Sequence, residues 1–194
     1  MSILRVLGCI QMTIHCSAYI ATSLDGFIAR KDGNLDWLTD PSKPSEDYGY
    51  ASYMSSIDVL VMGRNTFEKA LTFESWPYAG RQIVILSTTL TVENIPKAIT
   101  GSVEIHPGPL PELLNYLGSL GARRVYVDGG KVIQSFLAAG LIDEVTITRV
   151  PVLIGDGIPL FADPGRSIRL QHLRTKAFDN GLVQSTYRVK RDWP

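Results

Sequence analysis

The chain has 194 residues, of which 45% are hydrophobic, so it can form one globular domain with a sizeable core. Nineteen basic residues balance nineteen acidic ones, which removes the electrostatic case for binding nucleic acid or an anionic membrane. No apolar run approaches the roughly 20 residues that span a bilayer. Cys9 and Cys16 are too few for a disulfide framework or a metal site, which favours a reducing cytoplasm and no bound metal.

The N-terminal segment stands apart from the rest of the chain. Residues 1–11 are mildly apolar and lack a convincing signal cleavage site. Met12 comes just before the first clear strand pattern. We therefore expect residues 1–11 to be a loose extension and residues 12–194 to form a single domain.

The first predicted strand runs from Ile14 to Thr22, where apolar residues alternate. Asp-Gly pairs at 25–26 and 32–33 mark turns, and Trp37 lies in the long polar loop that follows. Loops of this length inside a compact domain are often functional, which suggests a mobile lid. The alternative is a plain surface excursion with Trp37 packed on the core.

A helix is predicted from Ser45 to Ile57, because Asp47, Tyr50, Ala51 and Met54 recur at helical spacing. The face that they share is otherwise apolar, so an acid on it needs an explanation. Asp47 either reaches a pocket or only stabilises the helix N-terminus through the helix dipole.

The most informative stretch is Asp58 to Leu71. Its apolar run ends in Gly63 and turns directly into a short helical pattern, as expected for a strand buried on both faces of a parallel sheet. Such a junction points backbone N–H groups at whatever lies above the strand end. Arg64 adds a positive fork and Thr66 a hydroxyl, a combination that suits a phosphate. A tight turn with a surface arginine is the alternative.

A second junction of the same kind follows the strand predicted from Arg124 to Asp128. Gly129 and Gly130 allow positive φ and close approach of a ligand to the backbone. Lys131 then stands at the end of a helix that attracts anions. Two such junctions in one domain indicate one ligand lying across several strand ends.

The remaining elements complete an α/β pattern. Strands are predicted at 82–87 and 103–106, followed by a helix that Gly121 closes. Ser87, Thr88 and Thr89 stand at a strand's carboxyl end, where open α/β sheets bind ligands, although hydroxyls there also form turns.

The C-terminal third reads as strands. Pro151 interrupts the strand predicted from Asp143 to Ile154, which indicates an edge position or a bulge. Strands at 168–178 and 182–190 are joined at Asp179-Asn180-Gly181, a strong hairpin signal. The order of elements predicts one three-layer α/β domain with a mostly parallel central sheet and an antiparallel C-terminal hairpin.

Residues 14–190 resemble the dihydrofolate reductase-like superfamily, and within it the reductase domain of the bacterial riboflavin-biosynthesis deaminase/reductase. Ser23-Leu24-Asp25-Gly26 is similar to the riboflavin-pathway reductases, whereas Met62-Gly63-Arg64 is more like dihydrofolate reductase itself. Gly129-Gly130 and Gly155-Asp156 are similar to both.

The resemblance implies an NADPH-dependent reductase that passes a hydride to a carbonyl or imine carbon of a pyrimidine or pteridine substrate. A basic residue often accompanies the adenosine 2′-phosphate after the third strand, but here only hydroxyls follow, so NADH stays open. By resemblance, the residues that contact the cofactor are Ala21, Ile28, Gly63, Arg64, Thr66, Ser87, Thr88, Gly129, Gly130, Lys131 and Val132.

For the substrate, the resemblance implies two candidate catalytic acids. Asp47 falls where dihydrofolate reductases place the acid that binds the pterin, and Asp25 falls in the loop that contacts substrate in the riboflavin-pathway enzymes. A true dihydrofolate reductase and a non-enzymatic nucleotide-binding relative remain as alternatives. The resemblance also implies a homodimer, to which the hairpin at 168–190 could contribute an exposed edge.

Overall fold

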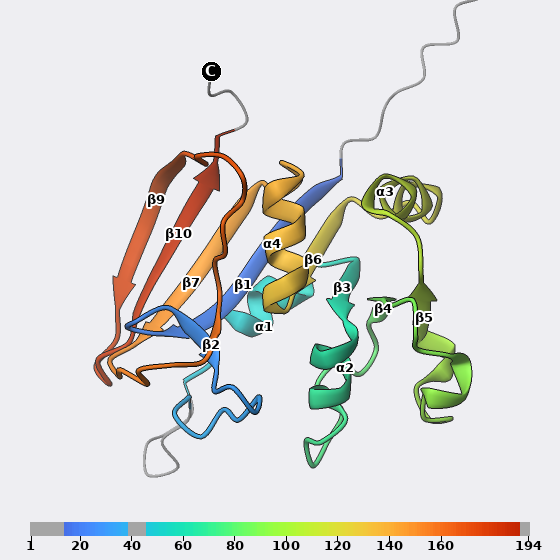
Figure 1. Ribbon diagram of the computed structural model, residues 1–194, viewed down its shortest axis with the longest axis horizontal. Coiled ribbons are helices and arrows are strands. Elements are labelled where there is room, and N and C mark those ends of the chain that lie inside the picture. Colours follow the sequence, from blue (N-terminus) through green and yellow to red (C-terminus); the bar gives the residue numbers. More distant parts are fainter. Residues whose placement is uncertain (1–13, 39–45, 191–194) are drawn as a thin grey trace, which may run out of the picture.

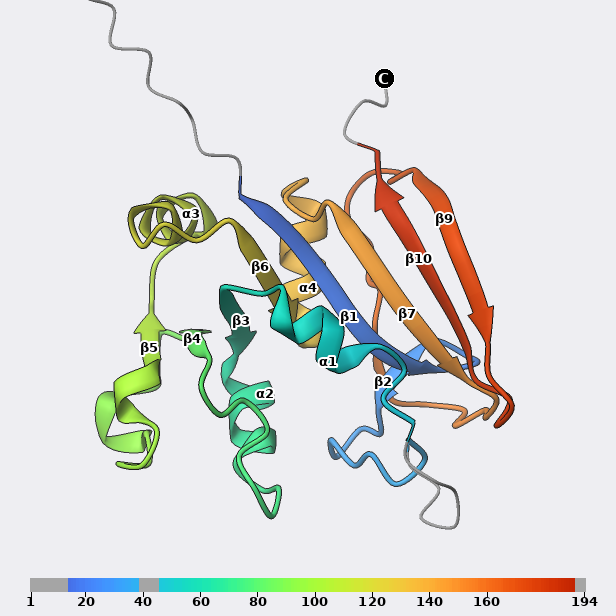
Figure 2. The same ribbon diagram turned by 180° about the vertical axis from the view of Figure 1, so that it is seen from behind.

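The computed structural model describes residues 14–38 and 46–190, so the predicted extension at 1–11 lies outside the described residues. The described chain forms a sheet in the order β5-β4-β3-β6-β1-β7-β10-β9, with helices on both faces (Figures 1 and 2). Its strands are β1 (His15–Ser23), β3 (Val59–Gly63), β4 (Gln82–Leu86), β5 (Val103–His106), β6 (Arg124–Asp128), β7 (Glu144–Val150), β9 (Leu170–Ala177) and β10 (Val183–Val189).

The strands from β5 to β7 in this order are all parallel, whereas β10 runs antiparallel to both β7 and β9. This confirms the predicted mostly parallel sheet with a C-terminal hairpin. Because β3 and β6 are parallel neighbours, with Met62 opposite Asp128, the two predicted strand–Gly–helix junctions leave the same edge of the sheet. The short strands β2 (Phe27–Ala29) and β8 (Ile158–Pro159), which were not predicted, pair with each other and lie against Gly130 of the second junction.

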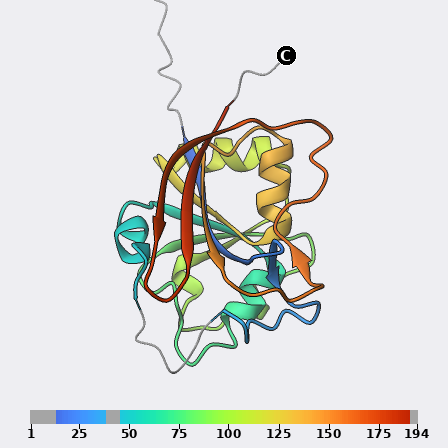
Figure 3. The same cartoon turned by 90° about the vertical axis from the view of Figure 1, so that its left-hand side faces the viewer.

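Two apolar clusters hold the helices against the sheet. Helices α1 (Tyr50–Ser55) and α2 (Arg64–Ala70) share one cluster, which includes Met54 and Phe67. Helices α3 (Leu110–Ser119) and α4 (Gly130–Ala138) share the other, which includes Leu113 and Phe136. Figure 3 shows α1 and α4 on opposite sides of the sheet. Two short 3₁₀ helices, η1 (Val92–Asn94) and η2 (Thr100–Ser102), lie between β4 and β5.

The helix predicted from Ser45 to Ile57 is shorter in the structure. Helix α1 begins at Tyr50, and residues 39–45 lie outside the described part of the chain. Tyr48 has φ 53° and Gly49 has φ 88°. Because two successive left-handed residues cannot continue a right-handed helix, the prediction was wrong for the first turn.

The prediction of an edge position or bulge for the Pro151 strand was also wrong. Strand β7 ends at Val150 and lies between β1 and β10, in the interior of the sheet. Pro151 follows the last paired residue, so its missing N–H removes no bond from either ladder.

A hydrogen-bond network joins the start of α1 to the C-terminal hairpin. The side-chain amide of Gln184 donates to the carbonyl of Tyr48 (3.2 Å), the hydroxyl of Tyr19 (2.8 Å) and the hydroxyl of Thr148 (3.0 Å). The Tyr19 hydroxyl donates to the same Tyr48 carbonyl (2.6 Å), and the Asn180 amide donates to the Tyr48 hydroxyl (2.6 Å). These bonds hold Tyr48 in its uncommon backbone conformation.

Candidate functional site

The two strand–Gly–helix junctions are in direct contact. A Cβ atom at Gly63 would lie 3.2 Å from the Val132 Cγ2 atom, and the Thr66 hydroxyl occupies the position that a Cβ atom at Gly129 would need. Gly129 also has φ 89°, a conformation that favours glycine. The structure therefore brings both predicted junctions into one site, as the sequence interpretation requires.

The glycines of this site are also packed against protein atoms. A Cβ atom at Gly130 would lie 2.9 Å from the Ile28 Cδ1 atom and 3.4 Å from the Pro159 carbonyl oxygen. Ile28 is in β2 and Pro159 is in β8, so the small second sheet lies directly over the start of α4. The structure thus gives Gly130 a second reason to be glycine, because protein atoms already leave no room for a side chain there.

The starts of both helices offer backbone donors. Gly63 is the N-cap of α2 and Gly129 the N-cap of α4, and neither described helix has a side-chain hydrogen bond at its N-cap. Gly130 and Val132 are buried in the first turn of α4, whereas Lys131 is exposed. Adjacent helix N-termini with glycine caps suit a group with several anionic oxygens, as in a pyrophosphate.

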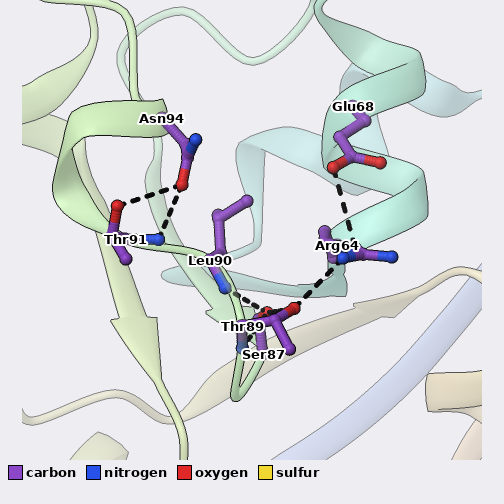
Figure 4. Close-up of polar contacts among 7 residues, drawn as sticks. All are labelled: Arg64, Glu68, Ser87, Thr89, Leu90, Thr91 and Asn94. Atoms are coloured by element: carbon purple, nitrogen blue, oxygen red, sulfur yellow. Dashed lines mark hydrogen bonds and ion pairs between the residues drawn. The ribbon is translucent and has the colours of Figure 1, made fainter.

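Arg64 lies between the start of α2 and the turn that follows β4 (Figure 4). Its guanidinium donates to the Thr89 hydroxyl (Nη1 to Oγ1, 3.1 Å) and lies 3.6 Å from the Glu68 carboxylate (Nε to Oε1). Both members of this ion pair are about half exposed, so the pair itself adds little stability. The sequence has no basic residue directly after β4, and the structure supplies one there from α2.

The turn after β4 is ordered by its own hydroxyls, as Figure 4 shows. The Ser87 hydroxyl oxygen accepts the backbone N–H groups of Thr89 (3.2 Å) and Leu90 (2.9 Å). Thr88, which lies between Ser87 and Thr89 in the turn, is exposed. Ser87 therefore forms the turn, and its hydroxyl also pairs with the Thr89 hydroxyl (3.4 Å), which accepts a hydrogen bond from Arg64.

Asp25 links the loop between β1 and β2 to the loop at 154–155 through hydrogen bonds. Its carboxylate accepts the backbone N–H groups of Gly155 (2.8 Å) and Ile154 (3.3 Å). A hydrogen bond from Ser23 and these backbone bonds lower the pKa of Asp25, although the side chain is exposed. An acid of this kind is ionised near neutral pH, so it can orient a substrate but is a poor proton donor.

Asp47 lies outside this arrangement. It is exposed just before α1, and its carboxylate accepts the backbone N–H of Ala51 at 3.0 and 3.2 Å. This contact is that of an acid at a helix N-terminus. Among the described residues, no hydrogen bond or ion pair joins Asp47 to either glycine junction.

The sequence interpretation missed Asp128, the buried acid at the end of β6. Its carboxylate accepts the backbone N–H of Gly129 (2.8 Å) and the hydroxyl of Tyr78 (3.1 Å). Burial raises the pKa of Asp128, which favours its protonated form. An acid directly before two glycines, at the end of an otherwise apolar strand, is the signal that could have identified it.

Tyrosines from β1 and α1 pack together on this side of the sheet. Tyr19 of β1 stacks on Tyr53 of α1, with ring centroids 4.6 Å apart, and lies 5.8 Å from the ring of Tyr50. Burial raises the pKa of Tyr50 and Tyr53, and the nearby Asp128 raises it further. These rings form an aromatic wall beside a carboxyl group, an arrangement that suits a flat heterocycle.

The two remaining predicted cofactor residues, Ala21 and Ile28, lie in strands β1 and β2. Ala21 is in β1, opposite Thr148 of β7, and Ile28 is in β2 against Gly130.

Within residues 14–38 and 46–190, no cluster of side chains could hold a metal ion. In the same residues, no helix is long and apolar enough to cross a bilayer.

Comparison with known proteins places this site in a family. Residues 15–184 match the model of the RibD C-terminal domain. The uncharacterized Bacillus subtilis (strain 168) protein YwjB is 31% identical over 84% of this chain and 92% of its own. The riboflavin biosynthesis protein RibD of Corynebacterium ammoniagenes is 28% identical, and the match covers 77% of this chain and 47% of that protein.

A solved structure shows the same fold over almost the whole chain. It comes from Shewanella sp. PV-4, and its name provisionally places it in riboflavin biosynthesis. It is 38% identical, with a TM-score of 0.82, over 91% of this chain and 99% of that chain. With the match to residues 15–184, this shows that the protein belongs to the RibD C-terminal domain family, whose members have the dihydrofolate reductase-like fold.

Proposed function

We propose that the protein is an NADPH-dependent reductase that transfers hydride to a carbonyl or imine carbon of a pyrimidine-type substrate. The closest known reaction is the reduction of 5-amino-6-(5-phosphoribosylamino)uracil in riboflavin biosynthesis. The observation that carries the proposal is the position of Arg64, which joins the start of α2 to the turn after β4 through Thr89.

The residues present fit a dinucleotide that lies along the edge of the sheet. The N-termini of α2 and α4, capped by Gly63 and Gly129, would hold the pyrophosphate. Arg64 and Ser87 would hold the adenosine 2′-phosphate, which favours NADPH over NADH. Bound NADPH would supply the hydride, and the protein would supply orientation and a proton source.

On the substrate side, Asp128 is the acid whose environment suits a proton donor. It is buried, its pKa is raised, and Tyr78 holds it in place. Asp25 would instead order the loop at 154–155 and contact the substrate as an anion. The aromatic wall of Tyr19, Tyr50 and Tyr53 would stack against the heterocycle.

A substrate screen tests this function. The purified protein is incubated with NADPH and either dihydrofolate or the ribosylaminopyrimidinedione, and oxidation of NADPH is followed by its absorbance. We expect turnover with the pyrimidinedione. Turnover with dihydrofolate alone would identify a dihydrofolate reductase. Absence of both turnover and NADPH binding by titration calorimetry would favour a non-enzymatic relative.

A further inference from the structure

A cavity lies on the α4 side of the sheet, and none of the glycine-junction residues lines it. We call it the α4 pocket; its volume is about 420 Å³, and residues 161–164 and 166–168 line it together with residues of α4. Figures 1 and 3 show the chain of this segment running beside α4. Leu137, near the end of α4, lines it, whereas Gly130 of the candidate site begins the same helix. The volume is within the range of small-molecule sites.

The walls of the α4 pocket are mainly apolar. Leu137 and Val145 line it and are buried, at 7% and 1% exposed. Phe161 and Leu170 also line it and remain 49% and 43% exposed. Because large apolar side chains around a concave surface gain free energy when they are covered, this combination indicates a ligand with an apolar body.

The charged groups of the pocket differ in how they are satisfied. The Asp163 carboxylate accepts the backbone N–H of Gly165 at 2.8 Å. In the described part of the chain, the Arg166 guanidinium has no hydrogen bond or ion pair. Its Nη2 atom lies 3.0 Å from the position of a Cβ atom at Gly140, so it is placed against the end of α4. Arg166 is therefore the charged side chain of this pocket that has no partner among the described residues, and as an exposed guanidinium it can donate to a ligand.

We propose that the α4 pocket binds a small organic anion with an apolar body. The apolar part would lie against Leu137, Val145 and Leu170, and the anionic group would accept hydrogen bonds from Arg166. The Ser167 hydroxyl, which also lines the pocket, is a further donor for the same group. A fatty-acid carboxylate of medium length has this chemistry, and so does an aromatic carboxylate.

Octanoate is the probe, with 1-octanol as its neutral counterpart, and binding is measured by titration calorimetry. Arg166→Gln removes the charge, Ala162→Trp fills the pocket from an exposed lining position, and Lys97→Gln is the control at a distant exposed cation. We expect saturable octanoate binding that Arg166→Gln weakens about tenfold, with octanol binding unchanged. Ala162→Trp should abolish binding of both probes, and Lys97→Gln should change neither.

Three results would overturn the proposal. The first is an absence of saturable octanoate binding by the wild type. The second is equal octanoate affinity in the wild type and Arg166→Gln, which would mean that the pocket does not select anions. The third is a dimer that Ala162→Trp converts to a monomer in light scattering, because the pocket would then receive a second copy of the chain.

Discussion

The side chain of Thr66 covers Gly129, so that its hydroxyl occupies the place where any other residue at 129 would carry its Cβ atom. Thr66 belongs to the first turn of α2, and Gly129 is the residue before α4. The contact therefore fixes the starts of two helices relative to each other. The backbone donors of these two helix starts, whose N-caps Gly63 and Gly129 are 66 residues apart in the chain, thus lie close together, as the proposed binding of a pyrophosphate requires.

Arg64→Ala should weaken NADPH binding more than NADH binding. The guanidinium is the cation that the structure places at the turn after β4, so its loss removes charge-assisted hydrogen bonds to a 2′-phosphate. We expect the NADPH dissociation constant to rise about tenfold, by titration calorimetry. Glu68→Gln, which only removes the ion-pair partner, is the matched control and should not weaken binding. Equal losses for NADPH and NADH would place the 2′-phosphate elsewhere.

Asp128→Asn should change how stability depends on pH. Burial raises the pKa of Asp128 above its ordinary 3.8, so the fold favours the neutral carboxyl. The stability from this group is complete below the ordinary pKa and is lost as pH rises through the raised pKa. The free energy of unfolding of the wild type minus that of Asp128→Asn should thus fall as pH rises. Urea denaturation at a series of pH values measures this difference.

The control for this experiment is an exposed acid. Asp179→Asn changes a carboxylate at the hairpin turn, outside the core. Its stability should run parallel to that of the wild type over the same pH range. A constant difference between the wild type and Asp128→Asn would show that the fold does not favour the neutral carboxyl of Asp128.

Asp25→Asn should reduce turnover more than Asp47→Asn does. The Asp25 carboxylate holds two backbone N–H groups of the loop at 154–155, and an amide has only one acceptor for them. Asp47 is exposed and bonded only to its own helix, so its replacement should cost about 1 kcal/mol of stability or less. Steady-state kinetics of both variants with saturating NADPH provides the comparison. Normal turnover of Asp25→Asn together with loss in Asp47→Asn would support the dihydrofolate reductase pattern.

Gly130→Ala should destabilise the protein through a specific contact with Ile28. The new Cβ atom would lie 2.9 Å from the Ile28 Cδ1 atom, which Ile28→Val removes. We expect Gly130→Ala to cost about 1 kcal/mol in the wild type. The cost should be about 0.5 kcal/mol smaller in the Ile28→Val background, as measured by a double-mutant cycle in urea. The same cost in both backgrounds would show that Ile28 does not limit the space.

The sequence predicts the architecture well, because apolar runs indicate buried strands and glycines indicate turns and helix ends. Val59 to Gly63 is an unbroken apolar run, and Leu60, Val61 and Met62 are all 0% exposed. Gly121 ends α3 in the left-handed conformation that its position predicts. Strands β2 and β8 escape prediction because they are too short to show a period.

The candidate site is less predictable, because its contacts depend on how distant segments meet. Arg64 reaches the turn after β4 only because α2 and that turn lie side by side, which no local pattern records. The start of α1 was predicted wrongly for a similar reason. Tyr48 is held in a left-handed conformation by Gln184 and Asn180, which are far along the chain. Asp128 shares a face with Tyr126, and strand alternation alone does not show what covers that face.

The bond between Gln184 and Tyr48 also bears on the order in which the protein folds. It joins groups that are 136 residues apart, and Gln184 lies in β10, the last strand in chain order. During synthesis, β3 and β6 can pair and bring the glycine junctions together before β10 has left the ribosome. The bonds that Gln184 makes to Tyr19 and Tyr48 must wait for β10, so the proposed nucleotide side of the site can form first and the proposed substrate side is completed last.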